Sequence, residues 1–74
     1  MKKKILIVED DMSIAEIQRD YLEFSGFDVH IQTDGVSGLN DIKKNEYDLL
    51  ILDIMLPKMN GYEILKNIRE TKDI

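Results

Sequence analysis

The chain has 74 residues, no cysteine and a formal net charge of −5 at pH 7. This length allows one small domain with a marginal core, and the lack of cysteine excludes disulfides, zinc–thiolate sites and thiol nucleophiles. The acidic balance argues against nucleic-acid binding by this segment. Three lysines at residues 2–4 precede an apolar run of only four residues, Ile5–Val8. That run is too short for a signal-peptide core or a membrane span.

The first predicted element is a strand over roughly Lys4–Val8, because residues 5–8 are all apolar. Fully apolar runs separated by helical patterns are typical of buried parallel strands. A helix follows, with apolar residues at helical spacing along one broad stripe: Ile14, Ile17, Tyr21, Leu22 and Phe24. Gly26 then stands where a helix ends in the left-handed conformation.

The next predicted element is an edge strand over Asp28–Gln32, half exposed to water. Its residues alternate, so Val29 and Ile31 share one face while His30 and Gln32 share the other. His30 is the only histidine in the chain. On the polar side of an edge strand it is better interpreted as a solvated side chain than as a metal ligand or a phosphohistidine.

A shorter helix and a third strand complete the middle of the chain. Asp34 and Gly35 predict a turn. The helix after it is marked by three apolar residues at helical spacing: Val36, Leu39 and Ile42. Asn45–Asp48 then predicts a loop, and the apolar run Leu49–Leu52 predicts a buried strand.

The last predicted element is a helix that begins near Asn60. Asn60 with Glu63 three residues later is typical of a helix N-cap. The inward stripe of this helix is expected to comprise Ile64, Leu65 and Ile68. The full order is βαβαβα, which predicts an α/β protein with a parallel sheet and right-handed crossovers.

Acidic residues follow the first and third strands at their carboxyl ends. Glu9, Asp10 and Asp11 follow the first strand, and Asp53 follows the third. In an open parallel sheet, ligands bind outside the carboxyl ends of the strands. If these two strands are neighbours, the carboxylates meet and repel unless a proton or a metal intervenes. A hard divalent cation, with Mg²⁺ first, would resolve the repulsion.

Simpler interpretations exist for two of these acidic residues. Asp53, taken alone, could be a turn former or a helix-start residue. Asp11 could favour the amino end of the first helix by its charge rather than contact a metal. The methionines after Asp53 are not expected to bind through sulfur, because thioethers do not suit a hard cation.

Two sequence motifs resemble those of the receiver domain of two-component response regulators. They are Val-Glu-Asp-Asp at residues 8–11 and Asp-Ile-Met-Leu-Pro at residues 53–57. The subgroup joined to winged-helix DNA-binding domains is the most similar, and the resemblance runs from Lys4 to about Arg69. It implies a flavodoxin-like receiver fold truncated to βαβαβα, with three parallel strands in the order 2-1-3. It also implies a cytoplasmic protein that receives its signal from a sensor histidine kinase and controls an output domain outside this chain.

The resemblance also implies a role for each matching site residue. Asp53 would accept the phosphoryl group. Glu9, Asp10 and Asp53 would hold Mg²⁺, with Mn²⁺ as an alternative, Asp10 directly and Glu9 through water. Met55 would offer only its backbone carbonyl to the metal. The loop after the phosphorylated strand would be shaped by Pro57 and Gly61.

The chain departs from the family pattern in its length. In the family, a switch Ser/Thr follows a fourth strand and a phosphate-binding lysine follows a fifth. We expect neither in residues 1–74, which we interpret as a truncated receiver without the fourth and fifth βα units. Lys58 and Lys66 do not follow a strand and cannot take the place of that lysine.

Three functions are therefore weighed. The first is a receiver segment phosphorylated on Asp53. The second is a fragment without phosphotransfer activity that assembles as a homodimer, through the third strand or by exchange of a strand–helix unit. The third is a haloacid-dehalogenase-type phosphatase, which needs another aspartate two positions after its nucleophile. Met55 occupies that position, and it disfavours the phosphatase.

Overall fold

A computed structural model describes residues 2–53 and 61–71 of the chain. Its elements are β1 (Lys4–Val8), α1 (Met12–Phe24), β2 (Asp28–Gln32), α2 (Gly35–Lys44), β3 (Leu49–Leu52) and α3 (Gly61–Thr71). The alternation of strands and helices is confirmed, and the three strands have the predicted bounds. In the part of the chain that is described, no helix has the length and apolar character needed to cross a membrane.

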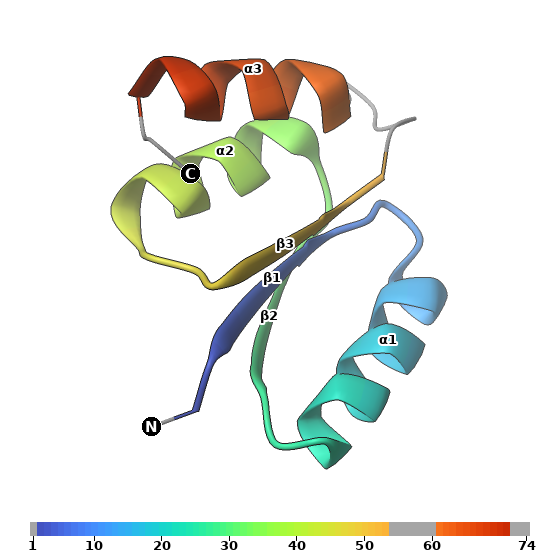
Figure 1. The fold of residues 1–74 in the computed structure, drawn as a ribbon. Helices are drawn as coiled ribbons and strands as arrows, with labels where there is room; N and C mark the ends of the chain where they lie inside the picture. Colours follow the sequence, from blue (N-terminus) through green and yellow to red (C-terminus); the bar gives the residue numbers. More distant parts are fainter. Residues whose placement is uncertain (1, 54–60, 72–74) are drawn as a thin grey trace.

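The three strands form one parallel sheet in the order β2-β1-β3, as the resemblance implied. Leu6 in the central strand is paired with His30 of β2 and with Leu50 of β3. Helix α1 lies on one face of the sheet, and α2 and α3 lie on the other (Figure 1). Each parallel connection runs through a helix, because parallel strands cannot be joined by a tight hairpin.

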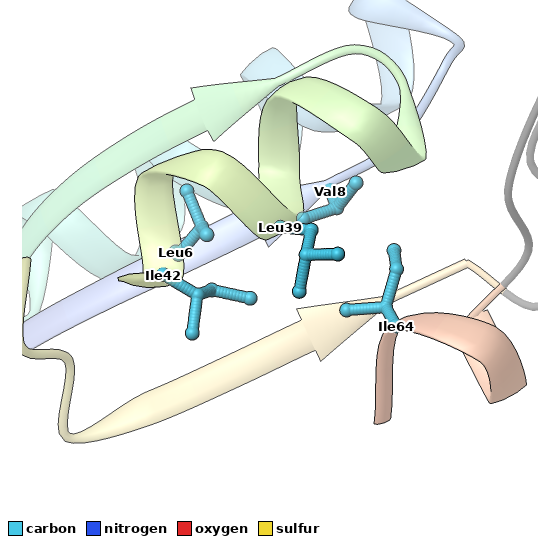
Figure 2. Close-up of a cluster of buried hydrophobic side chains, with 5 residues drawn as sticks. All are labelled: Leu6, Val8, Leu39, Ile42 and Ile64. Carbon is cyan, nitrogen blue, oxygen red and sulfur yellow. The ribbon is translucent and has the colours of Figure 1, made fainter. Parts of the chain in front are cut away.

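The core between the sheet and α2 is built from five buried side chains: Leu6, Val8, Leu39, Ile42 and Ile64. Figure 2 shows them meeting between β1, α2 and the first turn of α3. Gly38 makes this packing possible. A Cβ atom at Gly38 would lie 2.8 Å from Cγ2 of Val8, which is closer than real Cβ atoms come. The missing side chain therefore lets α2 approach β1, immediately before the acidic residues that follow β1.

The core on the opposite face of the sheet lies under α1. Its buried members are Ile5, Ile7, Ala15 and Val29. Of the stripe predicted for α1, Leu22 packs against this core, whereas Ile17 and Phe24 are 70% and 93% exposed. The predicted stripe is therefore wrong in grouping Leu22 with the other four residues, which lie on the exposed side of the helix. The periodicity alone could not reveal that Ala15 and Leu22 contact the sheet.

The prediction that β3 is buried is wrong for the described part of the chain. Leu49 is exposed and the other three residues are half-buried. The reason is that β3 is an outer strand of the described sheet, and α1 packs on β1 and β2 instead.

Helix α3 also differs in part from its prediction. Ile64 is fully buried, as expected. Leu65 is 37% exposed and does not belong to an inward stripe. Asn60, the predicted cap, and the side chain of Ile68 lie outside what the structure describes.

The ends of α1 follow from local chemistry. The Asp11 side chain accepts hydrogen bonds from the backbone N–H groups of Ser13 and Ile14, at 2.9 and 3.3 Å. This is the geometry of an N-cap, and it satisfies donors that the helix itself leaves unpaired. Gly26 has a φ of 99°, which confirms the left-handed conformation expected after the helix.

Helix α2 begins where the sequence predicted a turn. Gly35 is its first residue, and Asp34 is its N-cap. The Asp34 carboxylate accepts a hydrogen bond of 2.8 Å from the Ser37 backbone N–H. An aspartate–glycine pair favours a turn and a helix start through the same side-chain acceptor, so the sequence alone did not separate the two.

Candidate metal centre

The candidate site is built where β1 and β3 end side by side. Val8 pairs with Leu52 in the parallel register. The backbone N–H of Asp53 donates to the Val8 carbonyl at 3.0 Å, and the N–H of Glu9 donates to the Gln32 carbonyl of β2 at 3.0 Å. Backbone hydrogen bonds on both sides of β1 therefore fix Glu9 and Asp53 at the same edge of the sheet.

Three carboxylates meet at this edge. Glu9, Asp10 and Asp53 each offer one oxygen, and these oxygens lie within 4.8 Å of one another. Glu9 and Asp53 are half-buried and Asp10 is exposed. The sequence predicted this meeting from two strand ends far apart in the chain. The roles of the three residues in metal binding and phosphorylation stay predictions.

The environment of the cluster changes the pKa of Glu9. Burial raises the pKa of the Glu9 carboxyl, and the neighbouring Asp10 and Asp53 carboxyls raise it further. The backbone N–H of Asp11, which donates to Glu9 Oε1 at 3.1 Å, acts in the opposite direction without cancelling these effects. A carboxylate with a raised pKa favours a proton or a cation beside it.

The donor set fits Mg²⁺ or Mn²⁺. All three side chains offer carboxylate oxygen, the ligand that hard divalent cations prefer, and Asp10 is exposed to water, which suits a cation such as Mg²⁺ that retains several waters. Asp11 is not a member of the cluster in the described residues, since its carboxylate caps α1. The capping interpretation of Asp11 is therefore the better one.

Only one of the remaining predicted site residues, Gly61, lies in the part of the chain that the structure describes. Met55 and Pro57 lie outside the described residues, as does Lys58. Gly61 is the first residue of α3. Their proposed contributions, a backbone carbonyl for the metal and the shape of the loop, stay predictions.

A second polar cluster, which the sequence did not predict, is centred on Asp41 of α2. Its carboxylate accepts hydrogen bonds from Gln32 Nε2 at 2.9 Å, from Tyr47 Oη at 2.7 Å and from Asn45 Nδ2 at 2.9 Å. Burial alone would raise the Asp41 pKa, but these three donors outweigh it and the pKa is lowered. The cluster ties α2 to β2 and to the segment before β3. The spacing of Asp41 and Asn45 on one helix side was its only sequence signal.

His30 is better connected than a solvated side chain. It is exposed, but its Nε2 lies 3.4 Å from Asp28 Oδ1 and its ring meets the edge of Tyr47 at a centroid distance of 5.8 Å. Tyr47 packs against the α2 core. The prediction that His30 is exposed to solvent is thus correct, but it did not include the contacts of His30 with Asp28 and Tyr47.

Comparison with known proteins gives a consistent result. Residues 5–74 match the sequence pattern of the response regulator receiver domain. The response regulator ArlR of Staphylococcus saprophyticus is 46% identical over 69 residues, covering 93% of this chain and 31% of ArlR. The alkaline phosphatase synthesis transcriptional regulatory protein PhoP of Bacillus subtilis is 43% identical over 72 residues, covering 97% and 30%. The chain spans about a third of the length of these relatives.

A similar solved structure is the response regulator protein TrrA of Thermotoga maritima, in complex with Mg²⁺ and BeF. It is 34% identical and superposes with a TM-score of 0.90, covering 95% of this chain and 61% of TrrA. The described architecture is therefore shared with a protein whose structure contains magnesium.

Proposed function

Because the chain belongs to the response regulator receiver family, we propose that Asp53 accepts a phosphoryl group from a sensor histidine kinase in a Mg²⁺-dependent reaction. The observation that carries this proposal is the carboxylate cluster, in which Asp53 lies within 4.8 Å of Glu9 and Asp10 at the ends of adjacent strands. The chain would act as a regulatory domain rather than as an enzyme. Its output would be control of transcription by a DNA-binding domain, which the name of the relative PhoP supports.

In the proposed reaction an Asp53 carboxylate oxygen attacks phosphorus. The bond between phosphorus and the kinase histidine nitrogen breaks, and an acyl phosphate forms on Asp53. Phosphoryl transfer needs positioning and charge neutralisation more than acid–base chemistry. Glu9 and Asp10, with Asp53, would hold the Mg²⁺, which when bound offsets negative charge on the phosphoryl oxygens. The raised pKa of Glu9 supports this assignment, because a cation there would replace a proton.

The proposed roles of the neighbouring residues follow the family. Met55 would supply its backbone carbonyl to the metal, and Pro57 and Gly61 would shape the loop before α3. Within residues 1–74 we assign no counterpart of the family's switch Ser/Thr or of its phosphate-binding lysine. Phosphorylation of this chain by itself should then be slow, because preorganised positive charge is usually a large part of such catalysis.

Metal binding provides the first test. Titration with Mg²⁺ should shift NMR amide signals of residues 9–11 and 53, and Asp10→Asn should abolish the shifts. Asp11→Asn is the matched control, because it removes a neighbouring charge while asparagine still caps the helix. Loss of the shifts in both variants, or in neither, would contradict the assignment of Asp10.

Phosphorylation provides the second test. The chain is incubated with acetyl phosphate and Mg²⁺, and the modified residue is located by mass spectrometry. We expect slow modification of Asp53 that is absent from Asp53→Asn and strongly reduced in Asp10→Asn. Modification that persists in Asp53→Asn would sink the proposal.

A further inference from the structure

Asp11 makes hydrogen bonds in two directions. Its side-chain Oδ1 accepts from the backbone N–H groups of Ser13 and Ile14, at 2.9 and 3.3 Å. Its own backbone N–H donates to Oε1 of Glu9 at 3.1 Å. Asp11 therefore connects the first turn of α1 to one carboxylate of the candidate metal centre.

The sequence leaves the Asp11 N–H available for Glu9. In a capping box, the N–H of the N-cap residue bonds to a Glu or Gln side chain three positions later. The position three residues after Asp11 is Ile14, whose apolar side chain cannot accept a hydrogen bond. Glu9, two residues before the cap, accepts from this N–H instead. A donor that many helices satisfy within their first turn is thus directed at the carboxylate cluster.

The helix start that carries this donor is fixed to the sheet. Ala15 of α1 is fully buried against the sheet, and its backbone N–H donates to the Asp11 carbonyl at 3.0 Å. On the other side, the backbone N–H of Glu9 donates to the Gln32 carbonyl at 3.0 Å. Glu9 is therefore held at its backbone by β2 and at its carboxylate by the start of α1. The second contact restricts a side chain that otherwise has many rotamers.

We propose that Asp11 is a positioning residue for the metal centre: its cap on α1 aims its backbone N–H at Glu9, and this hydrogen bond holds Glu9 in the carboxylate cluster. The inference rests on the proposed function, because it assigns Asp11 a role toward the Mg²⁺ of that site. Asp11 acts without contacting the metal. Residues that orient a metal ligand in this way commonly change metal affinity by about tenfold or more when they are removed.

The Mg²⁺ affinity of variants at position 11 tests the proposal. NMR titration should give a dissociation constant about tenfold weaker for Asp11→Ala than for the wild type. Asp11→Asn should restore the affinity to within about threefold of the wild type, because asparagine keeps the cap and only a solvent-screened charge is lost. If Asp11 acted through its charge, Asp11→Asn would bind as weakly as Asp11→Ala, and that result would overturn the proposal.

Two further variants separate positioning from helix stability. Glycine is a tolerated N-cap without a side-chain acceptor, so Asp11→Gly should stay folded and still lose affinity as Asp11→Ala does. Glu16→Gly removes the same charge and weakens the exposed middle of α1, but it leaves the cap intact. Its affinity should stay within about threefold of the wild type, with circular dichroism reporting the helix content of each variant. Equal weakening in Glu16→Gly, or wild-type affinity in Asp11→Gly, would overturn the proposal.

A double-mutant cycle with Glu9→Ala tests whether Asp11 acts through Glu9. In the Glu9→Ala background, Asp11→Ala should weaken Mg²⁺ binding by less than about twofold, because the group that it positions is already gone. A repeat of the tenfold loss in that background would overturn the proposal and leave the proposed function intact. Absence of Mg²⁺ binding by the folded wild type would instead overturn the proposed function, and this inference with it.

Discussion

The two faces of the sheet bury the same strand in different ways. Residues of β1 alternate between them, with Leu6 and Val8 under α2 and α3, and Ile5 and Ile7 under α1. All four side chains are at most 1% exposed. On the α2 face, the helices themselves bury large side chains, including Leu39, Ile42 and Ile64. On the α1 face, the buried helical residue is Ala15.

This difference shows that complete burial of a central strand does not require a complete layer of helices. In the described residues α1 alone covers this face of β1, and several of its large apolar side chains, including Ile17 and Phe24, remain exposed. The α2 face should therefore contribute more to folding stability than the α1 face. Four predictions can break or sharpen this contrast.

The largest effect is expected for Ile42→Ala, compared with Ile17→Ala. Ile42 is 3% exposed in the α2 core, and its truncation should lower the free energy of unfolding by about 2–5 kcal/mol. Ile17 is 70% exposed, and its truncation to alanine should change the free energy of unfolding by less than about 0.5 kcal/mol. Urea unfolding followed by circular dichroism at low micromolar concentration measures both without a contribution from association. Equal losses would mean that α1 also packs through its outer side.

The next largest effect is expected for Gly38→Ala. The added Cβ would press on Val8, which is fully buried and cannot move into solvent. Overpacking should cost about 1–3 kcal/mol, reduced by up to about 1 kcal/mol because alanine favours helix more than glycine. In a Val8→Ala background the penalty should vanish, and a double-mutant cycle measures this coupling. An additive double mutant would show that the close approach of α2 to β1 is not limiting.

A smaller effect is expected for Asp41→Asn, which tests the polar part of the α2 face. The neutral amide weakens the hydrogen bonds from Gln32, Asn45 and Tyr47, at a cost of about 1 kcal/mol at this partly exposed site.

The loss of stability caused by Asp41→Asn should depend on pH in a defined direction. The Asp41 pKa is lowered in the folded chain, so its contribution to stability is present above the ordinary aspartate pKa. The contribution is lost as pH falls below about 4 and through the folded pKa. Urea unfolding at a series of pH values should therefore give a shallower acid limb for Asp41→Asn than for the wild type. Parallel limbs would contradict the assigned role of Asp41.

The smallest effect is expected for Glu9→Gln at the metal centre. Unlike the other substitutions, it should raise the free energy of unfolding rather than lower it. The Glu9 pKa is raised, so its stabilising protonated form is present at low pH and lost as pH rises through the folded pKa. At neutral pH, without metal, Glu9→Gln should raise the free energy of unfolding by less than about 0.5 kcal/mol, because the group is solvent-screened. Mg²⁺ should stabilise the wild type more than the variant. Greater stability of wild type than variant in chelator would contradict this reading of the cluster.

The strands and the carboxylate edge could be predicted from the sequence. Short apolar runs between helical patterns indicate strand positions, and parallel strands necessarily bring their carboxyl ends to one edge. Glu9, Asp10 and Asp53 meet for that reason. The alternation of Val29 and Ile31 against His30 likewise followed from the two-residue period of a strand.

Other features depend on tertiary packing, which the local pattern does not contain. The spacing of Ile17 and Phe24 on α1 shows that they share a side of the helix, but not that the neighbouring side meets the sheet. The Asp41 cluster joins three segments by side-chain geometry, so no single stretch of sequence displays it. Leu49 was expected to be buried because an apolar run does not show whether an outer strand is covered.

The strand order has a consequence for synthesis. The strand made first, β1, is central, so its two edges are completed at different times as the chain is made. Val29 becomes available to pair with Ile5 early, whereas Leu49 reaches the other side of Ile5 only after α2 has been made. Long-range parallel pairing is the slow part of folding because a long loop must close first. A nascent chain that has not yet reached Asp53 can pair β1 with β2 but has no complete carboxylate cluster, so the cluster forms only when β3 joins the sheet.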